Sequence, residues 1–137
     1  MKILFICKAN VGRSQIAEAF FNKFSKKNKA ISAGSHAENY PAYLGKKLEQ
    51  TAQDIIKIMK EVGIDVSQKC PKQLTKEMAD WADKIIVLNK EPLPIYVSMK
   101  KVVLWDIQDL NHLSPEFQRK LRDQIKKKVK ELVKEIG

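Results

Sequence analysis

Short apolar runs alternate with longer amphipathic stretches along this chain. Residues 2–6 (KILFI), 84–88 (KIIVL) and 101–105 (KVVLW) are nearly continuous apolar runs without polar alternation. Such runs are typical of strands that are buried on both faces of a sheet. Residues 30–33 form a further short apolar run that ends at Gly34. The pattern therefore predicts four strands, three of them fully buried.

Helical spacing fills the first two intervals between these strands. After Ser14, which is a good N-cap residue, apolar positions recur at helical spacing through Phe24. A second helix is predicted from Pro41 or Leu44 to Glu61, and Gly63 provides a stop signal after it. A polar loop that contains Tyr40 and Tyr43 precedes this helix.

The second half of the chain contains two more predicted helices. A short one begins near Thr75, after a loop that contains Cys70. A long one runs from Ser114 to about Ile136, with serine as N-cap and Pro115 at its first position. The apolar spacing predicts that the last helix buries Phe117, Leu121, Ile125, Val129, Leu132 and Ile136.

Buried strands that alternate with helices indicate an α/β fold, with a parallel sheet between two layers of helices. Crossover connections between parallel strands are right-handed, so a ligand crevice is expected at the carboxyl ends of the strands, where the strand order reverses. The segment CKANVGRS, residues 7–14, follows the first strand directly. We therefore expect this segment to lie at the crevice.

Length and composition restrict the class of protein. The 137 residues, 44% of them hydrophobic, suffice for one core, so residues 1–137 are expected to form a single domain. Two cysteines do not make a disulfide framework, and no apolar run approaches the roughly 18 residues of a membrane span. These features predict a cytoplasmic protein with reduced thiols and no membrane partner.

The formal net charge of +10 comes mainly from lysine, because arginine occurs only at positions 13, 119 and 122. The lysines are spread along the chain and do not alternate with aromatic residues. This distribution favours a solvated basic surface over a nucleic-acid interface. The resulting field attracts anionic substrates without defining them.

The segment CKANVGRS has the features of an anion-binding loop. A strand that leads through a tight loop into a helix points successive backbone N–H groups at one place, with the positive end of the helix dipole behind them. Gly12 permits backbone geometry that a side chain would resist. Arg13 offers a planar fork that binds a tetrahedral oxyanion through two hydrogen bonds. The loop therefore predicts an oxyanion site.

Cys7 stands at the mouth of this loop. Amide donors and a guanidinium stabilise a thiolate over a thiol, which makes Cys7 a candidate nucleophile at neutral pH. Ser14 can donate a hydroxyl to the sulfur, and Asn10 can hold the loop through side-chain hydrogen bonds in a left-handed backbone conformation. The alternative is that Cys7 is a small buried apolar residue at a strand end. The combination of Cys7 with Arg13 in one loop favours the interpretation of Cys7 as a nucleophile.

The order Cys7, Asn10, Arg13, Ser14 after a strand resembles the Cys-x-x-Asn-x-x-Arg-Ser motif of the low molecular weight protein tyrosine phosphatases and of the thioredoxin-coupled arsenate reductases. Further similar segments follow in order: AEAFF, SAG, GIDVS, KQLTKE, ADKIIVL and WDIQD. The resemblance covers almost the whole chain. It implies a flavodoxin-like three-layer α/β/α sandwich with a four-stranded parallel sheet, and chemistry without metal or cofactor through a phosphocysteine intermediate.

The resemblance also implies roles for individual residues. Cys7 would attack phosphorus, and Arg13 would hold the phosphoryl oxygens together with the loop amides. An aspartate after the last strand would protonate the leaving oxygen and then activate water. Asp109 is the first candidate for this acid and Asp106 the alternative. The residues expected to bind substrate are Lys8, Ala9, Asn10, Val11, Gly12, Ser14 and Tyr40.

The chain departs from the tyrosine phosphatases after Asp109. The residues LNH follow it, where that family tends to carry proline and then aromatic residues that form a wall of the phenol pocket. Tyr40 and Tyr43 are candidates for another aromatic wall. His112 could assist proton transfer, although a lone loop histidine is more often only solvated.

Gln15 is a feature that the chain shares with the arsenate reductases. Those enzymes pass the intermediate to further cysteines near the third strand, but the corresponding segment here, IIVLNKEPLP, has none. Cys70 is the one other thiol, and Gly12 stands where both groups often have a cysteine that could protect Cys7.

Three functions follow from these residues, in order of preference. The first is a phosphatase for phosphotyrosine or other aryl phosphomonoesters, acting on a phosphorylated protein or a small aryl phosphate. The second is an arsenate reductase that uses Cys7 with Cys70 or an external thiol. The third is a non-enzymatic oxyanion-binding or sensor module. In each, phosphate, arsenate or vanadate would occupy the loop, and nucleic acid is the least expected partner.

Overall fold

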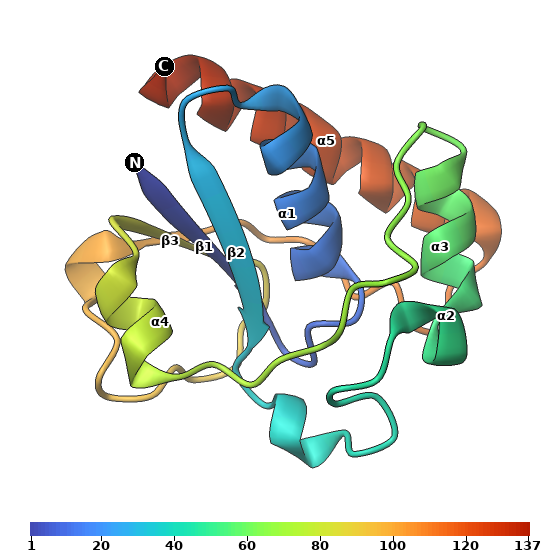
Figure 1. Ribbon diagram of the computed structural model, residues 1–137, viewed down its shortest axis with the longest axis horizontal. Coiled ribbons are helices and arrows are strands. Elements are labelled where there is room, and N and C mark those ends of the chain that lie inside the picture. The colour runs from blue at the N-terminus through green and yellow to red at the C-terminus, as the bar shows by residue number, and fades with distance from the viewer.

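Four parallel strands form the centre of the structure, a computed structural model that describes residues 1–137. The strands lie in the order β2-β1-β3-β4 (Figure 1). Their bounds are β1 Lys2–Cys7, β2 Lys29–Gly34, β3 Lys84–Val87 and β4 Val102–Leu104. In the register, Cys7 stands beside Gly34, and Ile6 stands beside Val87. The last residues of β1 are therefore flanked by strands on both sides.

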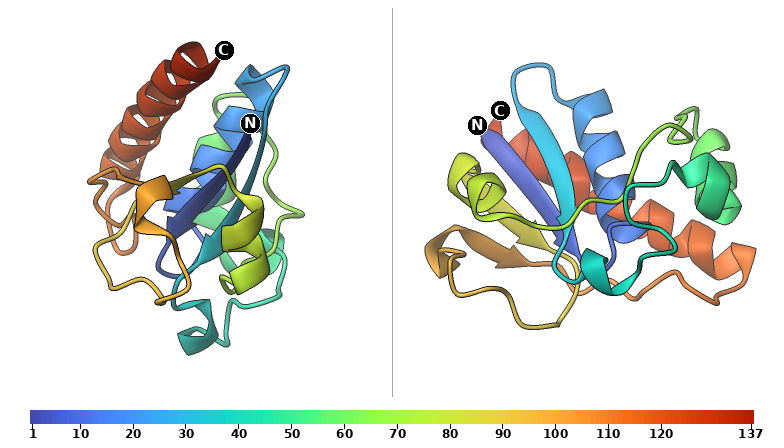
Figure 2. Two further views of the ribbon diagram at one scale, coloured as in Figure 1. Left: turned by 90° about the vertical axis from the view of Figure 1, so that its left-hand side faces the viewer. Right: turned by 60° about the horizontal axis from the view of Figure 1, so that its bottom comes forward.

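Helices cover both faces of the sheet (Figure 2). The long helix α5 (Pro115–Ile136) and α1 (Arg13–Phe24) pack on one face, and α4 (Lys76–Trp81) packs on the other. The other helical segments are α2 (Leu48–Thr51), α3 (Gln53–Lys60) and the 3-10 turns η1 (Ala37–Asn39) and η2 (Met99–Lys101). The predicted three-layer α/β/α fold is confirmed.

Side chains alternate along β1 between two hydrophobic cores. Ile3 and Phe5 belong to the core under α1 and α5, whereas Leu4 and Ile6 belong to the core under α4. All four are fully buried, as the uninterrupted apolar run of this strand predicts. This double burial fixes β1 in the middle of the sheet and so fixes the position of the loop that follows it.

The single helix predicted from residue 41 or 44 to residue 61 is wrong in two respects. Helix α2 begins only at Leu48, because Gly45 adopts a left-handed conformation (φ 74°) and its N–H bonds to the Pro71 carbonyl. The helix is then interrupted at Ala52 (φ −139°, ψ 61°), and α3 starts anew. Backbone bonds from residues 45–49 to residues 67–71 replace those of a continuous helix.

The fourth strand and the last helix also differ from the prediction. β4 is not buried on both faces: it is an edge strand paired with β3 alone, and the Leu104 side chain is 56% exposed. Phe117 was expected in the core but is 55% exposed. It lies in the first turn of α5, a helix that extends past the sheet (Figure 1). Lys120 Nζ lies 5.3 Å from the centre of the Phe117 ring.

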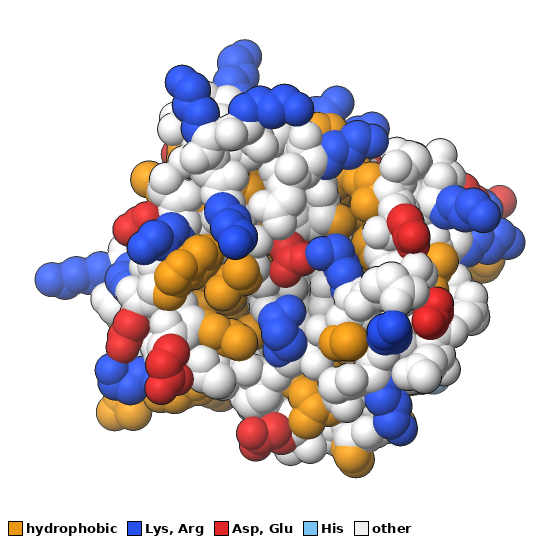
Figure 3. Space-filling view, in the orientation of Figure 1, with side chains coloured by type: hydrophobic (Ala, Val, Ile, Leu, Met, Phe, Trp, Pro, Cys, Tyr) orange, Lys and Arg blue, Asp and Glu red, His pale blue; other side chains and the backbone are white.

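The surface carries its basic side chains in a dispersed pattern. Lysine and arginine side chains are scattered over the face shown in Figure 3, between acidic and hydrophobic ones. This agrees with the expected solvated lysine-rich surface. None of the helices has both the length and the apolar character that crossing a membrane requires.

Candidate active site

The segment 7–13 lies at the carboxyl end of β1, the strand that has β2 on one side and β3 on the other. A cavity of about 180 Å³ opens here. Its lining comes from residues 7–9 and 11–13, from Tyr40 and Tyr43, from residues 51, 52, 54 and 55, and from residues 109–111. The crevice predicted at the switch point of the sheet is therefore present, and CKANVGRS lies at it.

Gly34 allows the loop after β1 to pass close to β2. A Cβ atom on Gly34 would lie 2.8 Å from the Lys8 carbonyl oxygen and 2.9 Å from the Ala9 carbonyl carbon. The next two residues then fix the loop, since Ser35 N donates to Cys7 O and His36 N donates to Lys8 O. The sequence pattern identified Gly34 only as the end of a strand. Its contact with residues 8 and 9 could not be predicted, because these residues are distant from Gly34 in the chain.

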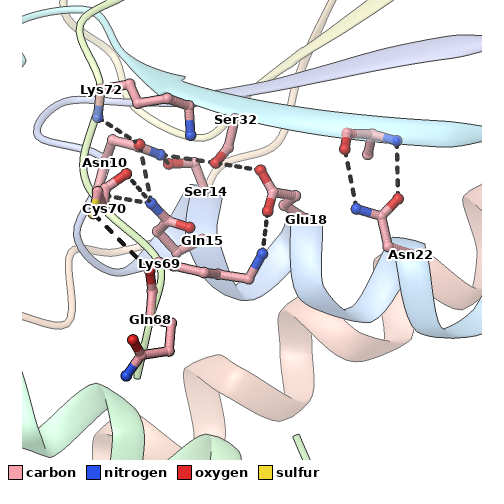
Figure 4. A network of polar contacts seen from close by, with 11 residues as sticks. Asn10, Ser14, Gln15, Glu18, Asn22, Ser32, Gln68, Lys69, Cys70 and Lys72 are labelled. Carbon is pink, nitrogen blue, oxygen red and sulfur yellow. Dashed lines mark hydrogen bonds and ion pairs between the residues drawn. The ribbon is translucent and has the colours of Figure 1, made fainter. Parts of the chain in front are cut away.

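Asn10 holds the loop from inside. It adopts the left-handed conformation (φ 61°) and its side chain is fully buried. Its Nδ2 donates to Ser14 Oγ at 2.7 Å and to Ser32 Oγ at 3.0 Å (Figure 4). Its Oδ1 accepts from the backbone N–H of Lys72 and from Gln15 Nε2. Both expectations for Asn10, the left-handed backbone and the loop-holding hydrogen bonds, are confirmed.

Ser14 does not cap α1, contrary to the prediction. The helix starts at Arg13 with Gly12 as N-cap, and no side chain caps it. The Ser14 hydroxyl lies 2.9 Å from Cys7 Sγ instead. Because this hydroxyl accepts a hydrogen bond from Asn10, its own hydrogen is free to donate to the sulfur. A thiolate at Cys7 therefore has a charge-assisted donor beside it.

Arg13 is fixed by two backbone carbonyl groups, one directly after β3 and one in the segment after β4. Its Nη1 donates to Leu88 O at 2.9 Å and to Ile107 O at 3.0 Å. Its Nη2 lies 4.0 Å from Asp109 Oδ2. The side chain is 9% exposed and lines the cavity together with Cys7. The guanidinium is thus held in one orientation at the cavity that Cys7 also lines.

The structure separates the two candidate acids. Asp109 lines the cavity and its Oδ1 accepts from the Asn111 backbone N–H. Asp106 lies outside the lining and pairs with Lys90, with 3.4 Å between Nζ and Oδ1. Leu110, where the tyrosine phosphatases that the loop motif resembles tend to carry proline, is buried in the core and anchors the segment that presents Asp109.

Tyr40 and Tyr43 form part of the cavity wall. Lys8 Nζ lies 5.9 Å from the centre of the Tyr40 ring and 3.8 Å from Glu91 Oε1. The neighbouring Tyr40 phenol, together with Glu91, raises the pKa of Lys8. His112 is exposed and is not part of the lining.

The Cys70 thiol is not part of the cavity lining. Cys70 is half-buried, and its carbonyl oxygen accepts a hydrogen bond from Gln15 Nε2 at 3.2 Å. Both cysteines are free thiols. Of the other predicted site residues, Lys8, Ala9, Val11 and Gly12 line the cavity, whereas Asn10 and Ser14 are buried behind it.

A partly buried ion pair behind the loop was not foreseen. Ser32 Oγ donates to Glu18 Oε1 at 2.9 Å, and Lys69 Nζ pairs with Glu18 Oε2 (Figure 4). Nothing in the spacing of Glu18 and Lys69 along the sequence points to this pair. No group of three His, Cys, Asp or Glu side chains is arranged to hold a metal ion.

Comparison with known proteins gives consistent matches over nearly the whole chain. The model of one family, described as low molecular weight phosphotyrosine protein phosphatase, matches residues 2–137. A glutaredoxin arsenate reductase from Synechocystis sp. is 31% identical, over 99% of this chain and 98% of that protein.

Two solved structures share the fold. Vibrio vulnificus Wzb in complex with benzylphosphonate has a TM-score of 0.87 and 26% identity, and the match covers 98% of this chain and 97% of that one. An arsenate reductase in the phosphate binding state has a TM-score of 0.81 and 28% identity, covering 99% and 98%.

Proposed function

Since the chain belongs to the low molecular weight phosphotyrosine protein phosphatase family, we propose that it hydrolyses phosphotyrosine or other aryl phosphomonoesters through a phosphocysteine intermediate. The observation that carries this proposal is the gathering of Cys7, Arg13 and Asp109 around one cavity at the end of β1. A nucleophile, an oxyanion clamp and an acid are the three groups that this reaction needs.

In the first step the Cys7 thiolate attacks phosphorus. The S–P bond forms while the bond from phosphorus to the leaving oxygen breaks. The loop amides and Arg13 bind the non-bridging oxygens, where negative charge is spread in the transition state. Asp109 donates its proton to the leaving oxygen, so that a neutral phenol departs.

In the second step water replaces the sulfur. Asp109, now a carboxylate, takes a proton from a water molecule as that water attacks the phosphocysteine. The S–P bond breaks, inorganic phosphate leaves, and the Cys7 thiolate returns. Ser14, 2.9 Å from the sulfur, can stabilise this leaving thiolate by its hydroxyl hydrogen.

An aromatic leaving group suits the walls of the cavity. Tyr40 and Tyr43 supply aromatic surface, and Ile55 and Leu110 supply apolar surface. The fold neighbour Wzb is known in complex with benzylphosphonate, which carries an aromatic ring next to its phosphonate. These features support an aryl phosphate as substrate.

The test is hydrolysis of 4-nitrophenyl phosphate and of a phosphotyrosine peptide. Turnover should vanish in Cys7→Ser and persist in Cys70→Ser, which removes the one other thiol. Trapping of a phosphorylated cysteine by rapid acid quench would identify the intermediate. Full activity of Cys7→Ser would overturn the mechanism.

Arsenate reduction is the second candidate, favoured by the arsenate reductase from Synechocystis that is 31% identical. Arsenate would form an S–As bond with Cys7, with loss of water. A second thiol would then attack the Cys7 sulfur, so that the S–As bond breaks, arsenic leaves as arsenite with As(V) reduced to As(III), and the two sulfurs form a disulfide. Because the Cys70 thiol does not line the cavity, an external thiol such as glutathione is expected to serve as reductant. Arsenite formation from arsenate and glutathione, without turnover of aryl phosphates, would favour this function.

A further inference from the structure

The cavity has an acidic side chain that the proposed reaction does not use. Asp54, in the first turn of α3, lines the cavity together with Cys7 and Asp109. It lies in the same wall as Ile55, whose Cδ1 is 3.6 Å from the place where a Cβ atom of Gly12 would be. Asp54 therefore belongs to a wall of the cavity that lies beside the loop and is not part of the loop itself.

The Asp54 carboxylate is held in place from behind. Gln118, which is only 4% exposed, donates from Nε2 to Asp54 Oδ2 at 2.8 Å. The same nitrogen donates to Leu110 O at 3.2 Å. One amide group of α5 thus connects the Asp54 wall to the segment that carries Asp109, and it leaves Asp54 Oδ1 without a protein partner.

Asp54 forms no ion pair with a lysine or arginine side chain. The ion pairs of the molecule do not include it. The two cations of the cavity have other partners, since Arg13 faces Asp109 and Lys8 faces Glu91. A fixed carboxylate without a counter-ion repels a doubly negative phosphate ester, unless the rest of the substrate supplies a positive charge.

On the premise that the protein hydrolyses aryl phosphomonoesters, we propose that Asp54 selects substrates whose leaving group carries a positive charge. A phosphotyrosine next to lysine or arginine has this character. The phosphate occupies the loop, the aromatic ring lies against Tyr40 and Tyr43, and the cation reaches Asp54. Because Asp54 is exposed, the preference for the cation is expected to be modest, about fivefold.

Binding of two benzylphosphonates tests this selection without requiring turnover. One probe carries a 4-aminomethyl group, which is an ammonium at neutral pH, and the other carries a neutral 4-hydroxymethyl group. Isothermal calorimetry gives the ratio of their dissociation constants. The wild-type protein should bind the ammonium probe about fivefold more tightly than the neutral one.

Two variants then test whether Asp54 is the source of the preference for the ammonium probe. Asp54→Asn keeps an oxygen that can accept from Gln118 but removes the charge, and the ratio should fall to about one. Asp80→Asn removes the same charge from an exposed position on α4, away from the cavity, and the ratio should remain at the wild-type value. An equal ratio in the wild type, an unchanged ratio in Asp54→Asn, or an equal fall in both variants would overturn the proposal.

Turnover of the two matching phenyl phosphates separates this inference from the function on which it rests. If neither ester is hydrolysed while the ratio of dissociation constants behaves as expected, the proposed phosphatase function fails and the selectivity of Asp54 stands. If both esters are hydrolysed with equal kcat/KM, the function stands and the selectivity fails.

Discussion

Arg13 Nη2 and Asp109 Oδ2 lie 4.0 Å apart at the cavity, although 96 positions separate them in the numbering. The guanidinium is the cation that faces the Asp109 carboxylate. A bound phosphate competes for the same guanidinium edge, since Nη1 is occupied by two carbonyl oxygens. Asp109 and the phosphate of a bound substrate are therefore expected on the same side of the Arg13 guanidinium.

Removal of the Asp109 carboxyl group should slow the chemistry far more than binding. Asp109→Asn is expected to lower kcat by about 100-fold to 10,000-fold, because general acid catalysis is lost. The inhibition constant of inorganic phosphate should change little. Steady-state kinetics with phenyl phosphate, a substrate with a poor leaving group, measures both. Asp106→Asn is the control, and a larger loss in that variant would exchange the roles of the two acids.

Arg13 cannot be replaced by another cation. Arg13→Lys keeps the charge but loses the two carbonyl bonds and the planar fork, so kcat/KM should fall by about 100-fold or more. Arg119→Lys makes the same exchange at a residue of α5 that pairs with Glu61 away from the cavity, and it should retain activity. Similar kinetics of Arg13→Lys and the wild type would contradict the role of the clamp.

An anion in the loop should shield the Cys7 sulfur. Alkylation by iodoacetamide is expected to slow about tenfold when phosphate is present at ten times its dissociation constant. Cys70 lies outside the cavity lining and serves as internal control, because phosphate should not alter its alkylation rate. Peptide mass spectrometry distinguishes the two sites. Equal protection of both cysteines, or of neither, would show that phosphate does not occupy the loop.

A methyl group at Gly34 should disturb the site through the backbone. Gly34→Ala places Cβ 2.8 Å from Lys8 O, so the loop must move, and the free energy of unfolding should fall by about 1–3 kcal/mol. Activity should fall as well, because Lys8 follows the nucleophile. Gly45→Ala is the control: φ is 74° but no atom lies within 4 Å, so only backbone strain is added. Urea unfolding with parallel assays compares the two variants.

Glu61 should make the fold sensitive to acid. Hydrogen bonds from Arg119 and then Arg122 lower the pKa of Glu61 from 4.5 to about 2. A lowered pKa in the folded state means that the ionised form stabilises the fold. This contribution is complete above pH 4.5 and is lost as the pH falls toward 2. The free energy of unfolding, measured by urea unfolding at several pH values in this range, should depend less on pH in Glu61→Gln than in the wild type. The same pH dependence in both proteins would contradict the linkage.

Some of the site was predictable because its parts are adjacent in the sequence. Cys7, Asn10, Arg13 and Ser14 lie within eight positions, and the geometry of a strand, a tight loop and a helix follows from local preferences. The buried character of β1 was also visible, since an unbroken apolar run suits a central strand. The left-handed conformation of Asn10 follows from the same local chemistry.

Other features depend on contacts between distant segments. The placement of the two candidate acids, with Asp109 at the cavity and Asp106 outside its lining, depends on how Leu110 packs into the core. The exposure of Phe117 depends on where the sheet ends beneath α5. The late start of α2, at Leu48, reflects backbone bonds from residues 45–49 to residues 67–71.

The sequence by itself determined the strand–loop–helix that carries Cys7 and Arg13, the alternation that gives a parallel sheet, and the family. The tertiary structure alone decided which distant side chains meet there: Gly34 beside the loop, Lys69 at Glu18, and Gln118 behind Asp54. The physical reason is that backbone preferences act over a few residues, whereas packing and hydrogen bonds across the sheet join positions whose spacing carries no periodic signal.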